Sequence, residues 1–425
     1  MSTAAPVRLP PVWKIGVLSA LYFAQGLPFG FQANALPLYL HELGLSKTRI
    51  GLLGALALPW SLKFLWAPMV DRFGSPRFGR RKSWIVPMQL LLAGTCLLAA
   101  AVPLTSETLV PFLSLILLMN LFAATQDIAV DGLAVDLLDP KELGAGNGAQ
   151  VVGYKIGMIV GGGLLVALAA RAGWSWLFLS MAGLCLLSMT VVLFVREGSG
   201  ASPEAVTPSE PEPKRGWREF LATVKELVKL PGAGWVIAAA ATYKAGETLA
   251  EAMFGLWLKE VHHIDKEQIA LWLGTWGVVA SIAGSVVGAV MATRLQLKHA
   301  VMIAAALRVI PLTAQWAMAA GWGTPSDTTI IPLTSAEHFF GGILTTTMFA
   351  LMMSSVDRRI GATHYTLLAS VEVIGKSGPR LLSGWLIDLL GWQLVFGVAV
   401  LLSAGFLGVV AQVPLKPRAP APATS

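Results

Sequence analysis

Long apolar stretches recur along the chain, each separated from the next by a short polar segment. Twelve of them are long enough to cross a bilayer, which takes roughly 20 helical residues. The runs are continuous and do not alternate with a period of two, so we expect helices rather than the strands of a barrel. The expected spans are 13–40, 49–70, 83–104, 108–138, 145–170, 173–195, 232–258, 267–293, 299–321, 327–356, 362–390 and 391–414.

The composition supports this interpretation and excludes an ordinary soluble domain. Of the 425 residues, 55% are hydrophobic and 13% are charged, and the mean hydropathy is +0.67. Soluble domains carry about 25% charged residues. We therefore predict an all-α polytopic membrane protein with twelve transmembrane helices in the lipid bilayer.

The basic residues outside the spans predict the orientation in the membrane. If the N-terminus is inside, 20 of the 31 Lys and Arg residues fall on the cytoplasmic side and five on the opposite side. Cytoplasmic loops of membrane proteins carry such an excess. Both termini are therefore expected in the cytoplasm, in a multi-pass protein of the inner (plasma) membrane. The net charge of +7 follows from this topology and predicts no nucleic-acid partner.

A polar segment divides the chain into two halves of six spans. Residues 197–215 are rich in Gly, Ser, Pro and Glu, as in a flexible linker, and 216–230 have the apolar spacing of an amphipathic helix on the inner leaflet. The fifth span of each half contains the pattern V-x-x-K-x-G, starting at Val152 and at Val373. We expect a six-helix bundle at 13–196, a cytoplasmic linker at 197–231 and a second bundle at 232–414.

Charged side chains lie within the apolar spans. A charge in the membrane interior costs several kcal/mol, and is kept where a water-filled pathway or a partner requires it. This predicts a transporter, and six cations along one pathway indicate an anionic solute. The basic residues are Lys63, Lys155, Lys244, Arg308, Lys376 and Arg380, and the acidic ones are Asp127, Asp131, Glu247, Glu251, Glu337 and Glu372.

Two acid–lysine pairs are expected at matched depths. Asp127 and Lys155 are equally far from the turn at 139–141, and at 1.5 Å per residue both lie about 20 Å from it. The same arithmetic, around the turn at 357–359, pairs Glu337 with Lys376.

Two pairs of carboxylates are candidates for proton coupling. Asp127 and Asp131 are four residues apart, as are Glu247 and Glu251, so each pair shares one helix face. Two carboxylates in a low-dielectric environment cannot both ionise cheaply, so one of them can bind and release a proton. The alternative, which the sequence leaves open, is a static ion pair that locks two helices together.

Other polar residues in the spans are expected to bind the solute, and one cytoplasmic loop is expected to gate the pathway. The solute-binding candidates are Gln25, Lys63, Gln126, Tyr154, Lys155, Tyr243, Lys244, Glu337 and Lys376. In the loop, an Asp followed by clustered Arg residues can hold the C-terminus of a neighbouring helix in one gating state, because cations favour that end of the helix dipole. Anchoring the topology is the alternative role. The loop residues are Asp71, Arg72, Gly79, Arg80 and Arg81.

These motifs carry a resemblance to a known family. The loop resembles that between helices two and three of the major facilitator superfamily, with Ala67 in place of the usual Gly and an insertion between Arg72 and Gly79. Within it, five segments in order resemble the muropeptide permease and acetyl-coenzyme A transporter group. They are Tyr22 to Pro28, Trp66 to Asp71, Gln126 to Asp131, Tyr154 to Gly157 and Tyr243 to Glu247. The segments Glu142 to Gly144 and Gln150 to Lys155 resemble an orphan animal branch of major facilitator domain-containing proteins.

The resemblance implies the major facilitator fold and proton-driven transport of an anionic solute by alternating access. Its bacterial members import anhydro-muropeptides and its eukaryotic members move acetyl-coenzyme A, so a symporter of the former and an exchanger of the latter both remain open. A membrane sensor that binds its ligand without transport is a third alternative. The sequence contains no apparent metal-ligand cluster, nucleophile elbow or phosphate-binding loop, so we expect no enzyme activity, no cofactor and no metal. We expect a monomer.

Overall fold

The computed structural model describes residues 10–36, 40, 56–75, 77–103, 105, 107–195, 232–269, 272–273 and 276–414. The chain divides into two compact units, each built from three segments. The first unit is Met1–Glu142, Ala149–Phe220 and Val356–Ser370, and the second is Leu143–Gly148, Leu221–Ser355 and Val371–Ser425. The linker expected at 197–231, with its amphipathic helix, lies outside the described residues, and the bundles at 13–196 and 232–414 stay a prediction.

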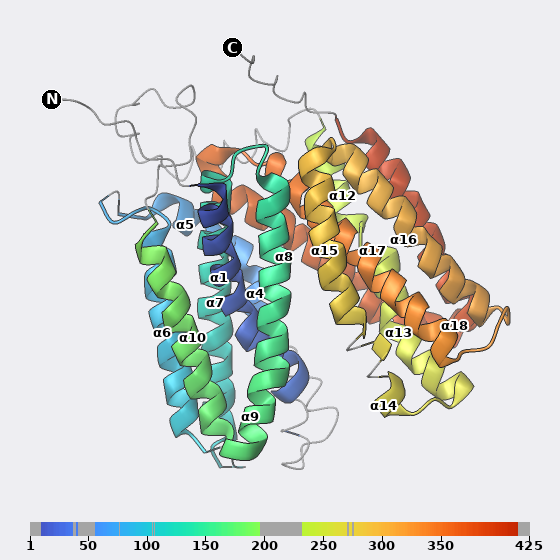
Figure 1. The fold of residues 1–425 in the computed structure, drawn as a ribbon, viewed down its shortest axis with the longest axis horizontal. Helices are drawn as coiled ribbons and strands as arrows, with labels where there is room; N and C mark the ends of the chain where they lie inside the picture. Colours follow the sequence, from blue (N-terminus) through green and yellow to red (C-terminus); the bar gives the residue numbers. More distant parts are fainter. Residues whose placement is uncertain are drawn as a thin grey trace. The chain divides into compact units, whose positions relative to one another are not determined.

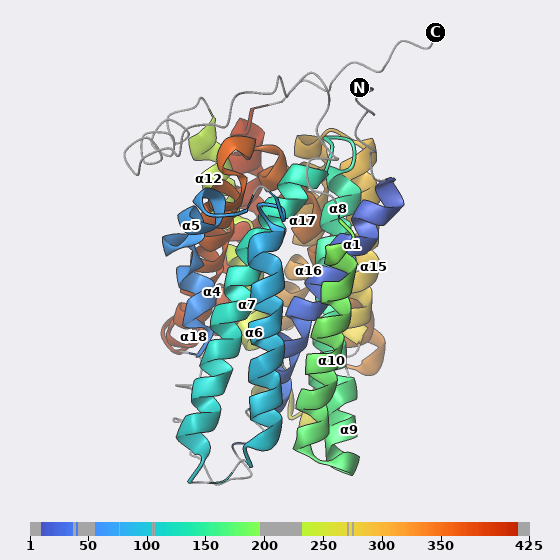
Figure 2. The ribbon, with the colours of Figure 1, turned by 90° about the vertical axis from the view of Figure 1, so that its left-hand side faces the viewer.

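The first unit is built from helices, of which α6 packs against both α7 and α10 (Figure 1 and Figure 2). Its core is apolar and aromatic, with the ring of Phe178 5.2 Å from Phe31 and 5.8 Å from Phe112. The elements are α1 (Pro11–Gly30), η1 (Phe31–Ala35), α4 (Leu58–Leu62), η3 (Lys63–Leu65), α5 (Ala67–Arg72), α6 (Lys82–Ala101), α7 (Leu109–Leu137), α8 (Leu143–Ile159), η4 (Val160–Leu164), α9 (Leu165–Ala172), α10 (Trp174–Leu193) and η7 (Arg358–Ile360). The first residues of α8 belong to the second unit.

The second unit is also helical, and α17 packs against both α15 and α16 (Figure 1). Four aromatic residues, Phe254, Trp257, Trp272 and Phe396, are buried in its core. The elements are α12 (Ala233–Thr242), α13 (Ala245–His262), α14 (Lys266–Ile269), α15 (Gly277–Arg294), α16 (Leu297–Ala319), α17 (Asp327–Ser354) and α18 (Gly361–Gln412). The first turns of α18 belong to the first unit.

Many of these helices are long and apolar enough to cross a membrane. By length and composition alone, seven helical runs of the described residues qualify, and the interruptions described below shorten others. The seven are Lys82–Ala101, Leu109–Leu137, Leu143–Ala172, Trp174–Leu193, Gly277–Arg294, Leu297–Ala319 and Arg358–Gln412. The last contains two expected spans, and it breaks at Gly391 with φ of 76°, which confirms the boundary expected there.

Two of the expected spans are broken within the region predicted as continuous helix. The second span passes from α4 through η3 to α5, and the seventh is interrupted between α12 and α13. Lys63 begins η3, and Lys244 is the N-cap of α13, so each break holds an intramembrane lysine. Non-helical backbone at membrane depth is tolerated where it is buried in protein or lines a cavity. The breaks are therefore candidate functional positions.

Glycines bring α1 and the α8–η4 run of the first unit into backbone contact. A Cβ atom added at Gly157 would overlap the carbonyl oxygen of Phe23, and one at Gly161 would overlap that of Leu27. From the other side, a Cβ at Gly26 would overlap the carbonyl oxygen of Tyr154. Small residues at such crossings let helices approach closely enough for backbone packing in a membrane.

We predict that Gly157→Ala lowers the stability of the detergent-solubilised protein by about 1–3 kcal/mol, the usual cost of forcing an extra methyl group into a packed interior. Gly163→Ala is the matched control, because a Cβ there meets no atom within 4 Å and both changes gain the same helix propensity. Thermal unfolding followed by tryptophan fluorescence measures both. Equal midpoints for the two variants would contradict the backbone contact.

Candidate functional site

The carboxylates of Asp127 and Asp131 converge on the ammonium group of Lys63 in the first unit. Lys63 donates a hydrogen bond to Asp127 Oδ2, and its Nζ lies 3.9 Å from Asp131 Oδ2. The exposed fractions of the three side chains are 6%, 10% and 2%. The expected shared face of the two carboxylates on α7 is thus present, and we call these three residues the acidic centre.

Asp131 is also held by uncharged groups. Tyr22 of α1 donates its hydroxyl to Asp131 Oδ1 over 2.6 Å, and Gln150 of α8 donates Nε2 to the same oxygen over 3.4 Å. Tyr365 of α18 in turn donates its hydroxyl to Gln150 Oε1 over 3.4 Å. Sequence reasoning missed Gln150 and Tyr365 as site residues. For Gln150 the available signal was its position one turn before the predicted residue Tyr154, whereas Tyr365 had no comparable signal.

Further polar contacts extend along α7. Asn120 accepts from the indole of Trp60 over 2.9 Å and donates to Gln32 over 2.6 Å. Two expected solute-binding residues, Gln25 and Gln126, are fully buried, and neither amide has a hydrogen-bond partner among the described residues. Buried amides are almost always hydrogen-bonded, so these two amides are candidates to bind water or a ligand.

The tyrosine and lysine expected to bind solute on α8 lie partly buried in the first unit. The ring of Tyr154 lies 5.7 Å from that of Phe29. Lys155 is half-buried, and its expected pairing with Asp127 stays a prediction. A cation that the structure places against Asp127 is Lys63 of η3, on the interrupted second span.

A second charged cluster lies in the second unit, around Arg308 of α16. Its Nη2 lies 2.6 Å from Glu337 and 3.5 Å from Glu247, and Glu247 lies 3.9 Å from Lys244. The imidazole of His338 lies 3.4 Å from Glu337. Arg308 and Glu337 are almost completely buried, so this cluster is a packed ion network, which we call the arginine cluster.

The expected pair of Glu337 with Lys376 is wrong. Lys376 lies 3.1 Å from Glu372, one turn earlier on α18, and Tyr243 donates its hydroxyl to Glu372 over 3.1 Å. Equal depth placed Glu337 and Lys376 at one level, but the helix that presents a cation to Glu337 is α16, its direct packing neighbour.

The intramembrane cations are compensated by carboxylates. Carboxylates lie within 4.0 Å of Lys63, Lys244, Arg308, Lys376 and Arg380, so the number of cations does not itself indicate an anionic solute. They differ in exposure: Arg308 and Lys63 are buried, Lys244 and Lys376 are half-exposed, and Arg380, which lies 3.7 Å from Glu251, is exposed. Glu247 and Glu251 therefore face different partners, although one helix face carries both.

The residues of the expected gating loop form a network of ion pairs and hydrogen bonds in the first unit, which we call the Asp71 network. Asp71 accepts hydrogen bonds from Arg80 and Arg81, at 2.7 and 2.8 Å, and from the backbone N–H groups of Ala362 and Thr363 at the start of α18. Burial alone would raise the pKa of Asp71, but the Arg81 and Arg80 guanidinium groups and the Thr363 N–H outweigh it and hold the pKa below its usual range. The Asp therefore acts as a cap for a helix N-terminus, which sequence reasoning did not anticipate.

One arginine of this loop reaches the last turn of a neighbouring helix, as expected. Arg81 is fully buried and lies 2.8 Å from Asp136 in the last turn of α7. The carbonyl of Leu138, just after that helix, accepts instead from Arg358 of η7, which lies outside the loop. Gly79, with φ of 114°, allows the turn before Arg80 and Arg81, both of which reach Asp71. Arg72 is exposed, with its guanidinium 5.4 Å from the ring of Phe73.

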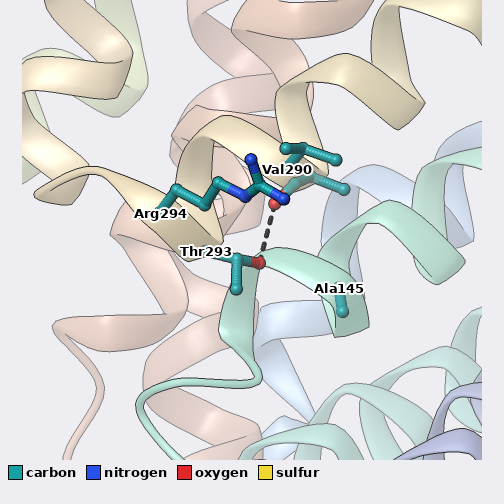
Figure 3. A pocket seen from close by; sticks show the side chains of 5 residues that line it. Ala145, Val290, Thr293 and Arg294 are labelled. Carbon is teal, nitrogen blue, oxygen red and sulfur yellow. Dashed lines mark hydrogen bonds between the residues drawn. The ribbon is translucent and has the colours of Figure 1, made fainter.

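A surface hollow of about 180 Å³ lies in the second unit, between the start of α8 and the end of α15 (Figure 3). It is lined by Ala145, Ala289, Val290, Thr293 and Arg294, and the Thr293 hydroxyl donates its hydrogen bond to the carbonyl oxygen of Ala289. Ligand pockets usually measure about 300–1,000 Å³, so this hollow is too small and too apolar for a charged solute. Among the described residues, no group of three His, Cys, Asp or Glu side chains could hold a metal ion.

Comparisons with known proteins agree with this architecture. A model of the Major Facilitator Superfamily matches residues 18–359. The chain is 27% identical over 385 residues to the anhydromuropeptide permease of Escherichia coli K12, covering 89% of this chain and 75% of that one. It is 24% identical over 410 residues to a putative transporter, AmpG 4, of Rickettsia conorii, covering 93% and 94%.

Solved structures share the fold. The transporter FucP, in the outward conformation, matches with a TM-score of 0.72 at 13% identity, covering 95% of this chain and 99% of that one. The human organic anion transporter MFSD10 matches with a TM-score of 0.65 at 17% identity, covering 95% and 100%. At these identities the likeness concerns the fold, which in this superfamily has twelve transmembrane helices.

The family model covers most of the chain, and the loop, broken spans and helix ends described above are consistent with it. The chain belongs to the Major Facilitator Superfamily and is a multi-pass membrane transporter of a small solute, related to the anhydromuropeptide permeases.

Proposed function

We propose that the protein imports an anionic solute, such as an anhydro-muropeptide, by proton-coupled symport with alternating access. The observation that carries the coupling is the environment of Asp131: a buried carboxylate whose short hydrogen bond comes from a neutral hydroxyl. The solute class is taken from the relatives of this chain, among them the anhydromuropeptide permease of Escherichia coli.

Asp131 is better suited than Asp127 to exchange the proton. Lys63 is hydrogen-bonded to Asp127 and lies 3.9 Å from Asp131, so its positive charge stabilises the Asp127 carboxylate more. The hydroxyl of Tyr22 can serve either form of Asp131, since it can donate to a carboxylate or accept from a carboxylic acid. Asp127 then serves as the partner of Lys63.

The solute's negative charge is expected to meet the exposed cations of the second unit. Lys244, Lys376 and Arg380 are more exposed than the other two intramembrane cations in these ion pairs, Lys63 and Arg308, and the ion pairs of Lys244 and Arg380 are long, at 3.9 and 3.7 Å. Carboxylates of a solute can compete for such loosely held groups. Arg308 is buried between two glutamates, so we assign Glu337 to holding Arg308 rather than to binding solute.

We propose that the Asp71 network stabilises one conformational state of the transport cycle. Asp71 and Arg81 tie the ends of α5 and α7 to the first turn of α18 through hydrogen bonds that must break if that helix end moves away. We further propose that both termini face the cytoplasm, that the protein lies in the inner membrane, and that it works as a monomer. The excess of basic residues on one side supports the orientation.

We predict that Asp131→Asn abolishes stimulation by a pH gradient. The protein in liposomes, given labelled anhydro-muropeptide and an exterior one pH unit more acidic than the interior, should accumulate solute to a level up to about tenfold higher than without the gradient, because one pH unit supplies about 1.4 kcal/mol per proton. Asp131→Asn should reduce this ratio to one while keeping exchange of labelled for unlabelled solute, since solute binding does not use Asp131.

The control is Asp388→Asn, which removes an exposed carboxylate of α18. It should retain the gradient-driven uptake. Full stimulation in Asp131→Asn would overturn the role of Asp131. If the folded parent protein takes up no muropeptide, the same assay with acetyl-coenzyme A tests the exchanger, which needs unlabelled solute inside and no gradient.

We predict that Asp71→Asn destabilises the protein by about 1.5–3 kcal/mol, the range for hydrogen bonds to a charged group. Because the folded-state pKa of Asp71 is depressed, the stabilisation is fully present above the unfolded-state pKa near 4 and is lost as the pH falls through the lower folded-state value. The difference in unfolding midpoint between parent and variant should thus be constant from about pH 8 to pH 5 and shrink below about pH 4. A difference that disappears between pH 7 and pH 5 would contradict the ion pair with Arg81.

A further inference from the structure

A chain of hydrogen bonds leads from Asp131 to the start of α18 within the first unit. Gln150 donates to Asp131, and Tyr365 donates to Gln150, each over 3.4 Å. Asp131, Gln150 and Tyr365 are 1%, 8% and 1% exposed, so bulk water does not replace these bonds. The three residues lie on α7, α8 and α18, and the amide of Gln150 is the link between the other two.

We propose that Gln150 is a positioning residue that makes the first unit's hold on residues 361–370 depend on the protonation of Asp131. The proposal rests on the proposed function in taking Asp131 as the proton carrier. The proposal adds a route by which protonation of Asp131 affects the start of α18. This helix is divided between the two units, since Val356–Ser370 belongs to the first and the rest of α18 to the second.

The argument follows from the two ends of an amide. An ionised Asp131 can only accept, so it fixes the Nε2 donor of Gln150 toward itself and leaves the Oε1 acceptor facing Tyr365. A proton on Asp131 makes the carboxyl group a donor as well, and reduces a charge-assisted bond to a neutral one of about half its strength. The amide is then free to turn, and the hydroxyl of Tyr365 loses its acceptor on Gln150.

Three further groups face Asp131. On its own helix it faces Asp127, from η3 it faces Lys63, and from α1 it faces Tyr22. Tyr22 binds the same oxygen as Gln150 from α1, and it also lies within electrostatic reach of Tyr365 of α18. Tyr22 and Tyr365 each contribute one hydroxyl to the network, and Tyr365 is the one that donates to Gln150.

The first turn of α18 has a second hold that does not change with the proton. Asp71 accepts from the N–H groups of Ala362 and Thr363, and its depressed pKa keeps it ionised throughout the neutral range. One end of the segment is thus held by a fixed charge and the next turn by a bond that depends on Asp131. A proton loosens the second hold without breaking the first.

The test measures opening of this segment by cysteine alkylation in the full-length protein. Thr366→Cys is the reporter, because Thr366 is fully buried and its hydroxyl has no partner among the described residues. The native Cys96 and Cys185 are buried and give the background rate. Rates with a small maleimide are measured from pH 8 to pH 5.5 and divided by those of free glutathione, which removes the titration of the thiol itself.

In the reporter background, labelling should rise about three- to tenfold on acidification, the change expected from one lost hydrogen bond. Asp131→Asn and Tyr365→Phe should each give the high rate at every pH, whereas Tyr22→Phe should keep the rise. Gln150→Met, of similar length without the amide, repeats the test if Tyr365→Phe does not fold. A pH-dependent rise that survives in Tyr365→Phe, or no rise in the parent, would overturn the proposal.

This experiment needs no solute, so it can fail independently of the proposed function. Gradient-driven uptake with no labelling change would leave the symporter and remove the role of Gln150. A labelling change without muropeptide uptake would retain the link from Asp131 to α18 and reject the solute.

Discussion

The ammonium group of Lys63, placed between Asp127 and Asp131, is the interaction on which the rest of the first unit depends. Two carboxylates buried a helical turn apart repel each other, and a single cation between them lowers that cost while leaving it unequal for the two. The cation is available because the second span is not a continuous helix. Lys63 begins the short segment between α4 and α5, and its ion pair fixes that broken span onto α7.

The second unit solves the same problem with a different cation. Arg308 keeps its proton under all physiological conditions and offers several donors at fixed angles, so it can bind Glu337 and approach Glu247 at once. Such a buried network keeps its charges when the pH changes and excludes water from its ion pairs. The acidic centre instead combines a lysine with neutral hydroxyl and amide partners, which tolerate either form of Asp131. The chemical contrast is a reason to assign the proton to the first unit.

Hydropathy and sequence motifs predicted the helical membrane architecture, because burial in lipid imposes length and composition on every span. They also predicted the loop that binds α7, since clustered arginines beside an aspartate have few other uses at a helix end. The pairing of Glu337 could not be found this way. Counting residues from a turn gives depth along a straight helix, but the partner is decided by which helix packs alongside, and α16 and α17 lie side by side. The breaks at Lys63 and Lys244 had a weaker signal, Pro59 and Pro68 around the first and none as clear around the second.

The position of Gln150 follows from a pattern that is legible in the sequence once the fold is known. Gly153, Gly157 and Gly161 recur every four residues, and each faces α1 so closely that a Cβ would collide with its backbone. Gln150 precedes Gly153 by three residues and so lies on the same side of α8. The glycines therefore bring the amide of Gln150 to the helix that carries Tyr22, and both side chains reach one oxygen of Asp131. Close packing of α8 on α1 is therefore required for the contacts of the Asp131 carboxylate. Any side chain added at the crossing of these two helices would move α8 away and lengthen the hydrogen bond from Gln150 to Asp131, which is already 3.4 Å long.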